Sequence, residues 1–165
     1  MRRAVKLDRI NRKILTILQE NARISNIELA DRVALSPSAC LQRVKALEEA
    51  GYILKYVMSV DLDKLFTHVM VYVEFTLERH KMDDFNRFER AIREIPEIVD
   101  CLWVSGRFDY ISFVVCSSVS HFNDLCDDLL TRNLGIARIN SNVVLDKPKW
   151  FGGYPLDQLE WKDGR

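Results

Sequence analysis

The sequence predicts an α+β protein of two domains, a small helical domain at the N-terminus and then a domain of order βαββαβ. Before residue 51, apolar residues recur every three or four positions in three short segments, which is the period of helices that bury one face. Between residues 69 and 145, segments rich in β-branched and aromatic residues alternate with segments of helical period. Residues 1–60 carry eleven Lys and Arg against six Asp and Glu, a net charge of +5, and the remaining residues carry −5. The change in the sign of the net charge therefore falls between the two predicted domains.

The first two helices are expected between Asp8 and residue 33. The first begins after Asp8 and ends near residues 21–22. Its buried face is expected to consist of Ile10, Ile14, Ile17 and Leu18. The second helix is short and begins at Ser25, because Ser25 with Glu28 three residues later is the pattern of a capping box.

The third helix is expected to start at Ser36 and Pro37. Serine is a preferred N-cap, and proline is tolerated in the first turn, where its missing N–H would have no partner. The helix stops at Gly51, and its packing face is expected to be Cys40, Val44 and Leu47. The β-prone residues 52–60 follow as a wing would. Residues 1–60 are thus predicted to form a winged helix-turn-helix domain, which binds double-stranded DNA.

The second domain follows a linker over residues 61–68. Strands are expected at 69–77, 99–105, 108–116 and 136–145, and helices at 82–95 and 119–134. This order is that of a ferredoxin-like sandwich, predicted over residues 69–149. Residues 150–165 form a tail without a clear period.

Several classes of function find no support in the sequence. The four cysteines show no CxxC pair, and the histidines (His68, His80 and His121) are scattered, so we expect no metal and no cofactor. No catalytic motif, signal peptide or membrane span is visible. We therefore expect a cytoplasmic protein that is not an enzyme.

The polar face of the third helix is the candidate DNA-binding surface. Gln42 can pair with adenine through two hydrogen bonds, and Arg43 can bind guanine or a phosphate. The expected contact residues are Ser36, Ser38, Ala39, Gln42, Arg43 and Lys45. The alternative is an ordinary solvated helix face. The helix-turn-helix and the basic charge of this half favour DNA.

A tight turn at Gly106 is the candidate ligand site. Glycine allows a positive φ and lets a ligand approach the backbone, whose N–H groups could hold a carboxylate. Asp109 could accept an ammonium group, and Arg107 could contact an anion. The alternative, favoured by composition alone, is a plain hairpin turn that Asp109 caps.

Taken in order, these segments resemble one known family, the Lrp/AsnC (feast/famine) transcriptional regulators. The resemblance covers roughly residues 7–148 and is carried by the segments 7–15, 21–25, 28–30, 33–38, 43–48, 51–53 and the turn 104–110. It identifies the second domain as similar to the family's effector-binding RAM domain. Asn11 and Ala34 depart from the family, which commonly has Asp and Gly there.

The resemblance implies a small effector, usually an amino acid, bound between RAM domains. It also implies homodimers that assemble further, typically into octamers. The candidate effector-binding residues are Ser105, Gly106, Arg107, Asp109, Tyr110, Ile139, Asn140 and Ser141. The rival is an enzyme similar to siroheme decarboxylases, which share both domains. It is disfavoured because residues 36–48 keep the regulator pattern and the histidines are dispersed.

Overall fold

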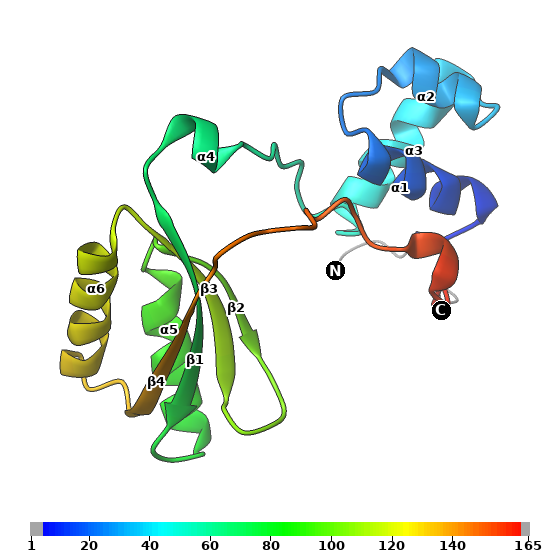
Figure 1. Ribbon diagram of the computed structural model, residues 1–165. Helices are drawn as coiled ribbons and strands as arrows, with labels where there is room; N and C mark the ends of the chain where they lie inside the picture. Colours follow the sequence, from blue (N-terminus) through cyan, green and yellow to red (C-terminus); the bar gives the residue numbers. More distant parts are fainter. Residues whose placement is uncertain (1–4, 163–165) are drawn as a thin grey trace. The chain divides into compact units, whose positions relative to one another are not determined.

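The computed structural model describes residues 5–162. The chain divides into two compact units (Figure 1). The first contains the residues up to Ser59 together with those from Lys149 onward, and the second contains Val60–Pro148. The C-terminal residues, which the sequence predicted as a separate tail, are therefore grouped with the helical N-terminal unit.

The first unit is built on three helices, as predicted. They are α1 (Arg9–Glu20), α2 (Asn26–Arg32) and α3 (Pro37–Glu49). The side chains of Asp8, Ser25 and Ser36 cap them by accepting hydrogen bonds from backbone N–H groups of the first turn. Their apolar faces meet in one core, formed by Leu7, Ile14, Ile17, Leu29, Ala30, Val33, Cys40 and Leu47.

The turn between α2 and α3 is a Schellman motif. The N–H of Leu35 donates to the carbonyl of Ala30, and the N–H of Ala34 donates to that of Asp31. Ala34 has φ +56°, the left-handed conformation that favours glycine. The same motif ends α3, where Gly51 occupies the equivalent place with φ +80°.

The connection between the units differs from the prediction. Residues 52–60 form no strand, although their composition is β-prone. A strand needs a neighbour for its backbone hydrogen bonds, and these residues pair with none among those that the structure describes. The predicted linker contains a helical turn, α4 (Leu62–Leu65), which the carboxylate of Asp61 caps.

The second unit has the predicted βαββαβ order, with elements β1 (Val69–Leu77), α5 (Met82–Arg93), β2 (Ile98–Trp103), β3 (Tyr110–Cys116), α6 (Val119–Thr131) and β4 (Ile136–Val143). The strands form one antiparallel sheet in the order β2-β3-β1-β4. This is the strand order of a ferredoxin-like sandwich. The observed elements end within a few residues of the predicted ones.

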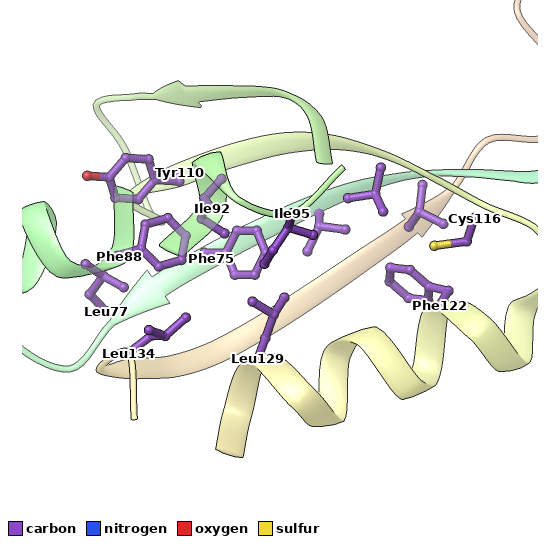
Figure 2. Packing of buried hydrophobic residues seen from close by; sticks show 13 residues of the cluster. Phe75, Leu77, Phe88, Ile92, Ile95, Tyr110, Cys116, Phe122, Leu129 and Leu134 are labelled. Atoms are coloured by element: carbon purple, nitrogen blue, oxygen red, sulfur yellow. The ribbon is translucent and has the colours of Figure 1, made fainter. Parts of the chain in front are cut away.

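Helices α5 and α6 lie on the same face of the sheet and cover its core (Figure 2). On β1, Val71, Val73, Phe75 and Leu77 are buried toward the helices, whereas Tyr72, Glu74 and Thr76 face the other side. On α6, Leu129 is buried, whereas the adjacent Leu130 is 53% exposed. Among the described helices, none is long and apolar enough to cross a membrane.

Candidate nucleic-acid interface and ligand pocket

In the last turn of α3 Glu48 and Glu49 are exposed, and before that turn its exposed face consists of Ser38, Leu41, Gln42 and Lys45. These residues follow one another at spacings of three, one and three, so they share one side of the helix. Ser38, Gln42 and Lys45 were predicted. Leu41 was missed, although its spacing from Ser38 and Lys45 would have placed it on this face. It is 44% exposed, an apolar side chain in the centre of a polar surface.

Arg43 does not belong to this exposed face. Its Nη1 lies 2.7 Å from Oδ2 of Asp8 and donates to Oδ1 of Asn11 at 3.0 Å. Both partners lie at the start of α1, so the guanidinium joins α3 to α1. The side chain is 33% exposed, and a tertiary ion pair draws it across the helix pair, so a contact of Arg43 with DNA stays a prediction.

Two further residues that were predicted to contact DNA, Ser36 and Ala39, differ in how exposed they are. Ser36 is exposed, and its hydroxyl accepts a hydrogen bond from the N–H of Ala39 at 3.3 Å, which caps the helix. Ala39 itself is half-buried. The Ser36 hydroxyl is thus used to cap the helix, and the Ala39 side chain is only partly accessible to DNA.

The contacts of Asp8 lower its pKa. Burial acts in the opposite direction, but the N–H of Asn11 and the Arg43 guanidinium outweigh it, so the pKa of Asp8 falls below 3.8. The Asn11 side chain, only 4% exposed, also donates to the carbonyl of Lys6 at 2.7 Å. This network fixes the orientation of α3 on α1.

In the second unit, the turn between β2 and β3 is tied down by Asp109. Its Oδ2 accepts a hydrogen bond from the N–H of Leu77 at 2.7 Å, and its Oδ1 lies 3.0 Å from Nε2 of His80. The N–H of Asp109 donates to the carbonyl of Phe75 at 2.9 Å. Gly106 has φ +148°, a positive value that glycine adopts readily. The carboxylate proposed to accept an ammonium group is therefore engaged with the protein itself.

The predicted effector residues divide between the two faces of the sheet. Tyr110 is 2% exposed on the helix-covered face, where its hydroxyl donates to Glu89 at 3.0 Å. Burial and this carboxylate raise the pKa of the Tyr110 hydroxyl. Ile139 and Ser141 pair with Phe75 and Val73, which also places them on that face. Asn140 pairs with Glu74 on the opposite face.

A pocket of about 290 Å³ lies on that opposite face. The residues that line it are Glu74, Thr76, Arg107, Phe108, Arg138 and Asn140. Arg107 and Asn140 were predicted, whereas Ser105 and Gly106 are exposed in the turn and do not line it. Glu74, Thr76 and Arg138 could have been found from the polar positions that alternate with apolar ones along β1 and β4.

The charges in this pocket are of both signs. Arg107 and Arg138 supply two guanidinium groups, and Glu74 supplies a carboxylate whose Oε2 accepts a hydrogen bond from Asn140 at 2.9 Å. The pocket can hold a small molecule that carries an anionic and a cationic group. Within residues 5–162, no group of three or more His, Cys, Asp or Glu side chains could hold a metal ion.

Comparisons with known proteins agree with both units. Residues 7–53 match the family described as winged helix-turn-helix DNA-binding, and residues 70–152 match the Lrp/AsnC ligand binding domain. The leucine-responsive regulatory protein of Escherichia coli K12 is 40% identical over 143 residues, which span 87% of this chain and 87% of that protein. The protein of the same name from Salmonella typhimurium matches equally.

Two solved structures are similar over nearly their whole length. A transcriptional regulator of Neisseria meningitidis in complex with L-methionine is 32% identical, with a TM-score of 0.81, and the match covers 92% of this chain and 97% of that one. A regulator of Agrobacterium tumefaciens described as an AsnC family protein is 31% identical, with a TM-score of 0.82 and coverage of 93% and 99%.

Proposed function

This chain belongs to the Lrp/AsnC family of DNA-binding transcriptional regulators, and from that premise we propose which of its surfaces bind DNA and effector. The family assignment makes it a regulator with an amino-acid effector domain and not an enzyme. The rival interpretation, a siroheme-decarboxylase-like enzyme, receives no support from these relatives.

The exposed face of α3 is the proposed DNA-reading surface. The observation that carries this proposal is the accessible set Ser38, Leu41, Gln42 and Lys45 on the second helix of the helix-turn-helix. Gln42 can pair with adenine, Leu41 can pack on a thymine methyl group, and Lys45 can bind a phosphate. Ser36 and Ala39 lie at the start of α3 and are proposed to contact the backbone of the duplex. Arg43 is left out because its guanidinium is held by Asp8.

A DNA site selected in vitro by the wild-type protein provides the test. Gln42→Ala is expected to lower the affinity for that duplex about 5- to 150-fold, which corresponds to about 1–3 kcal/mol per specific base pairing. Asn123→Ala, an exposed residue of α6, is the matched control and is expected to change nothing. Equal affinity of Gln42→Ala and wild type would contradict the proposed surface.

The pocket on the open face of the sheet is the proposed effector site, and its ligand is an amino acid. Arg107 and Arg138 can bind the carboxylate, and Glu74 can accept hydrogen bonds from the ammonium group. Its volume of about 290 Å³ accommodates one amino acid, and the ring of Phe108 offers an apolar contact for the side chain. Leucine and methionine, named for two relatives, are the first ligands to test.

Calorimetry with the twenty amino acids tests this site. At least one is expected to bind, and Arg138→Ala is expected to weaken binding tenfold or more because a charge-assisted hydrogen bond is lost. Arg90→Ala, an exposed arginine of α5 outside the pocket, serves as the control. Binding that survives Arg138→Ala, or no binding by any amino acid, would refute the proposal.

We also propose homodimers that assemble further, up to octamers. Support comes from apolar side chains exposed on residues 52–60, among them Leu54, Val57 and Met58, which are 87%, 66% and 80% exposed. Light scattering coupled to size-exclusion chromatography measures the oligomeric state, and a monomer at micromolar protein concentration would exclude the proposed assembly.

A regulator acts where its DNA lies, so the cytoplasm is its expected location.

A further inference from the structure

The C-terminal segment, residues 149–162, is bound to α1 by a pair of hydrogen bonds. Nε2 of Gln19 donates to the carbonyl of Tyr154 at 2.8 Å, and the N–H of Tyr154 donates to Oε1 of Gln19 at 3.0 Å. One side-chain amide thus satisfies both polar groups of one backbone residue, as a neighbouring strand would. Figure 1 shows this segment, drawn in orange and red, beside α1.

Gly153 allows the close approach that these hydrogen bonds require. Its φ is +111°, and a Cβ atom added there would lie 2.9 Å from Cδ and Nε2 of Gln19. The neighbouring Gly152 has no heavy atom within 4 Å of an added Cβ. Of the two adjacent glycines, only Gly153 therefore has a φ that strains any other residue, and a Cβ there would displace the Gln19 amide that makes both hydrogen bonds.

A second attachment lies farther along the segment. Trp161 packs against the hydrophobic core of the first unit, and the Arg12 guanidinium lies 5.5 Å from the centroid of its ring. Arg12 also donates from Nε to the carbonyl of Leu7 at 2.8 Å. The segment thus contacts α1 near both ends, at Arg12 and at Gln19.

Through α1, the segment is connected to α3, the helix that carries the proposed DNA-reading face. The start of α1 carries Asp8 and Asn11, which hold Arg43 of α3. The segment also continues the chain from β4, the strand that contributes Arg138 and Asn140 to the ligand pocket. The second unit is consequently joined to the first at both of its ends, at residues 59–60 and 148–149.

We propose that residues 149–162 are a positioning segment of the DNA-binding unit, which holds α1 so that α3 presents its reading face in the orientation that specific DNA requires. This inference rests on the proposed role of α3. It predicts that loosening the segment weakens binding to the specific site, where base contacts depend on orientation. Non-specific binding depends mainly on charge and is expected to remain.

The adjacent glycines provide the matched pair of variants. Gly153→Ala is expected to release the segment and to raise the Kd for the selected duplex about five- to tenfold, the lower range of coupling between sites. Gly152→Ala is expected to leave it unchanged, and both are expected to bind a random duplex as wild type does. Gln19→Ala should act like Gly153→Ala, and the double variant should be no worse than either, because all three break the same contact.

Fluorescence of Trp161, taken as the difference from the same variant carrying Trp161→Phe, reports whether the segment has been released. Release with an unchanged Kd for the selected duplex would overturn the proposal, as would equal losses for specific and random duplexes, which indicate a structural role only. Trp161 emission unchanged in both Gly153→Ala and Gln19→Ala would overturn the contact itself. The Gln42→Ala variant tests the proposed role of α3 separately, because Gln42 does not contact the segment. If Gln42→Ala binds the selected duplex as wild type does, the α3 proposal itself has failed.

Discussion

Replacement of Arg43 by alanine separates its structural role from a role in reading DNA. In Arg43→Ala, the carboxylate of Asp8 loses its charged partner, and Oδ1 of Asn11, which is almost fully buried, loses a donor at 3.0 Å. Asp8 continues to cap α1 through the N–H of Asn11 at 2.8 Å. The helices are therefore expected to form and to pack less firmly.

The expected loss of stability follows from these two contacts. Both charged side chains are about one-third exposed, 33% for Arg43 and 37% for Asp8, so solvent screening limits the ion pair to about 0.5–1 kcal/mol. The hydrogen bond to the buried amide adds about 1 kcal/mol. A total of about 1.5–2 kcal/mol corresponds to a Tm roughly 6–16 °C lower for a unit of this size.

Thermal unfolding and DNA titration, measured on the same samples, check this expectation. Lys45→Ala is the matched control on α3: it is expected to change stability by less than about 0.5 kcal/mol and to reduce the slope of log K against log salt by about one. Asp8→Asn keeps a capping side chain but removes the charge, and its coupling with Arg43→Ala is expected to be about 0.5–1 kcal/mol.

The pH dependence carries a definite sign. The pKa of Asp8 is lower in the folded protein than in the unfolded chain, so its stabilising effect is present above about pH 4 and is lost as the pH falls through the folded-state pKa. In Arg43→Ala, the free energy of unfolding should therefore decrease less as the pH is lowered through this range. An Arg43→Ala protein as stable as wild type, with the DNA-binding defect of Lys45→Ala, would refute the reasoning and return Arg43 to the DNA surface.

Three further predictions concern single positions. Ala34→Gly is expected to raise stability by roughly 0.5–1 kcal/mol, measured by chemical unfolding, because relief of the left-handed strain exceeds the added entropy of the unfolded chain; a loss of stability would contradict the assigned conformation. Leu41→Ala is expected to weaken binding to the selected duplex only while its thymines carry their methyl groups, so that replacing thymine by deoxyuridine abolishes the difference between variant and wild type; a difference that persists excludes methyl contact. Tyr110→Phe is expected to cost about 1 kcal/mol through loss of the hydrogen bond to Glu89 while amino-acid binding is unchanged; weaker binding at equal stability would restore Tyr110 to the effector site.

The elements of this protein were accessible from sequence because their signals are local. Ser25 and Ser36 mark helix starts through hydrogen bonds that span three residues, and the apolar period of each helix is visible without its neighbours. The strand β1 was predicted with its observed ends, and its buried positions alternate with less buried ones from Val71 to Leu77. The order βαββαβ then leaves few sheet topologies.

The residues 52–60 show where local signals are insufficient. Their composition favours a strand, but a strand forms only where another segment supplies hydrogen-bonding partners. The C-terminal segment shows the opposite case. It has no period of its own, and its order comes from Gln19 and Trp161, contacts that a sequence pattern does not display.

From the sequence alone, the helix-turn-helix, the ferredoxin-like sandwich and the family resemblance could be determined, because each rests on period, caps and the order of segments. Which side chains are free to act was decided only by tertiary structure. Arg43 and Asp109 carry charges suited to DNA and to an amino acid, yet both are held by partners from distant segments, at 2.7 Å from Asp8 and from Leu77. A charged side chain binds the nearest group that satisfies it, and only the folded chain determines which group that is.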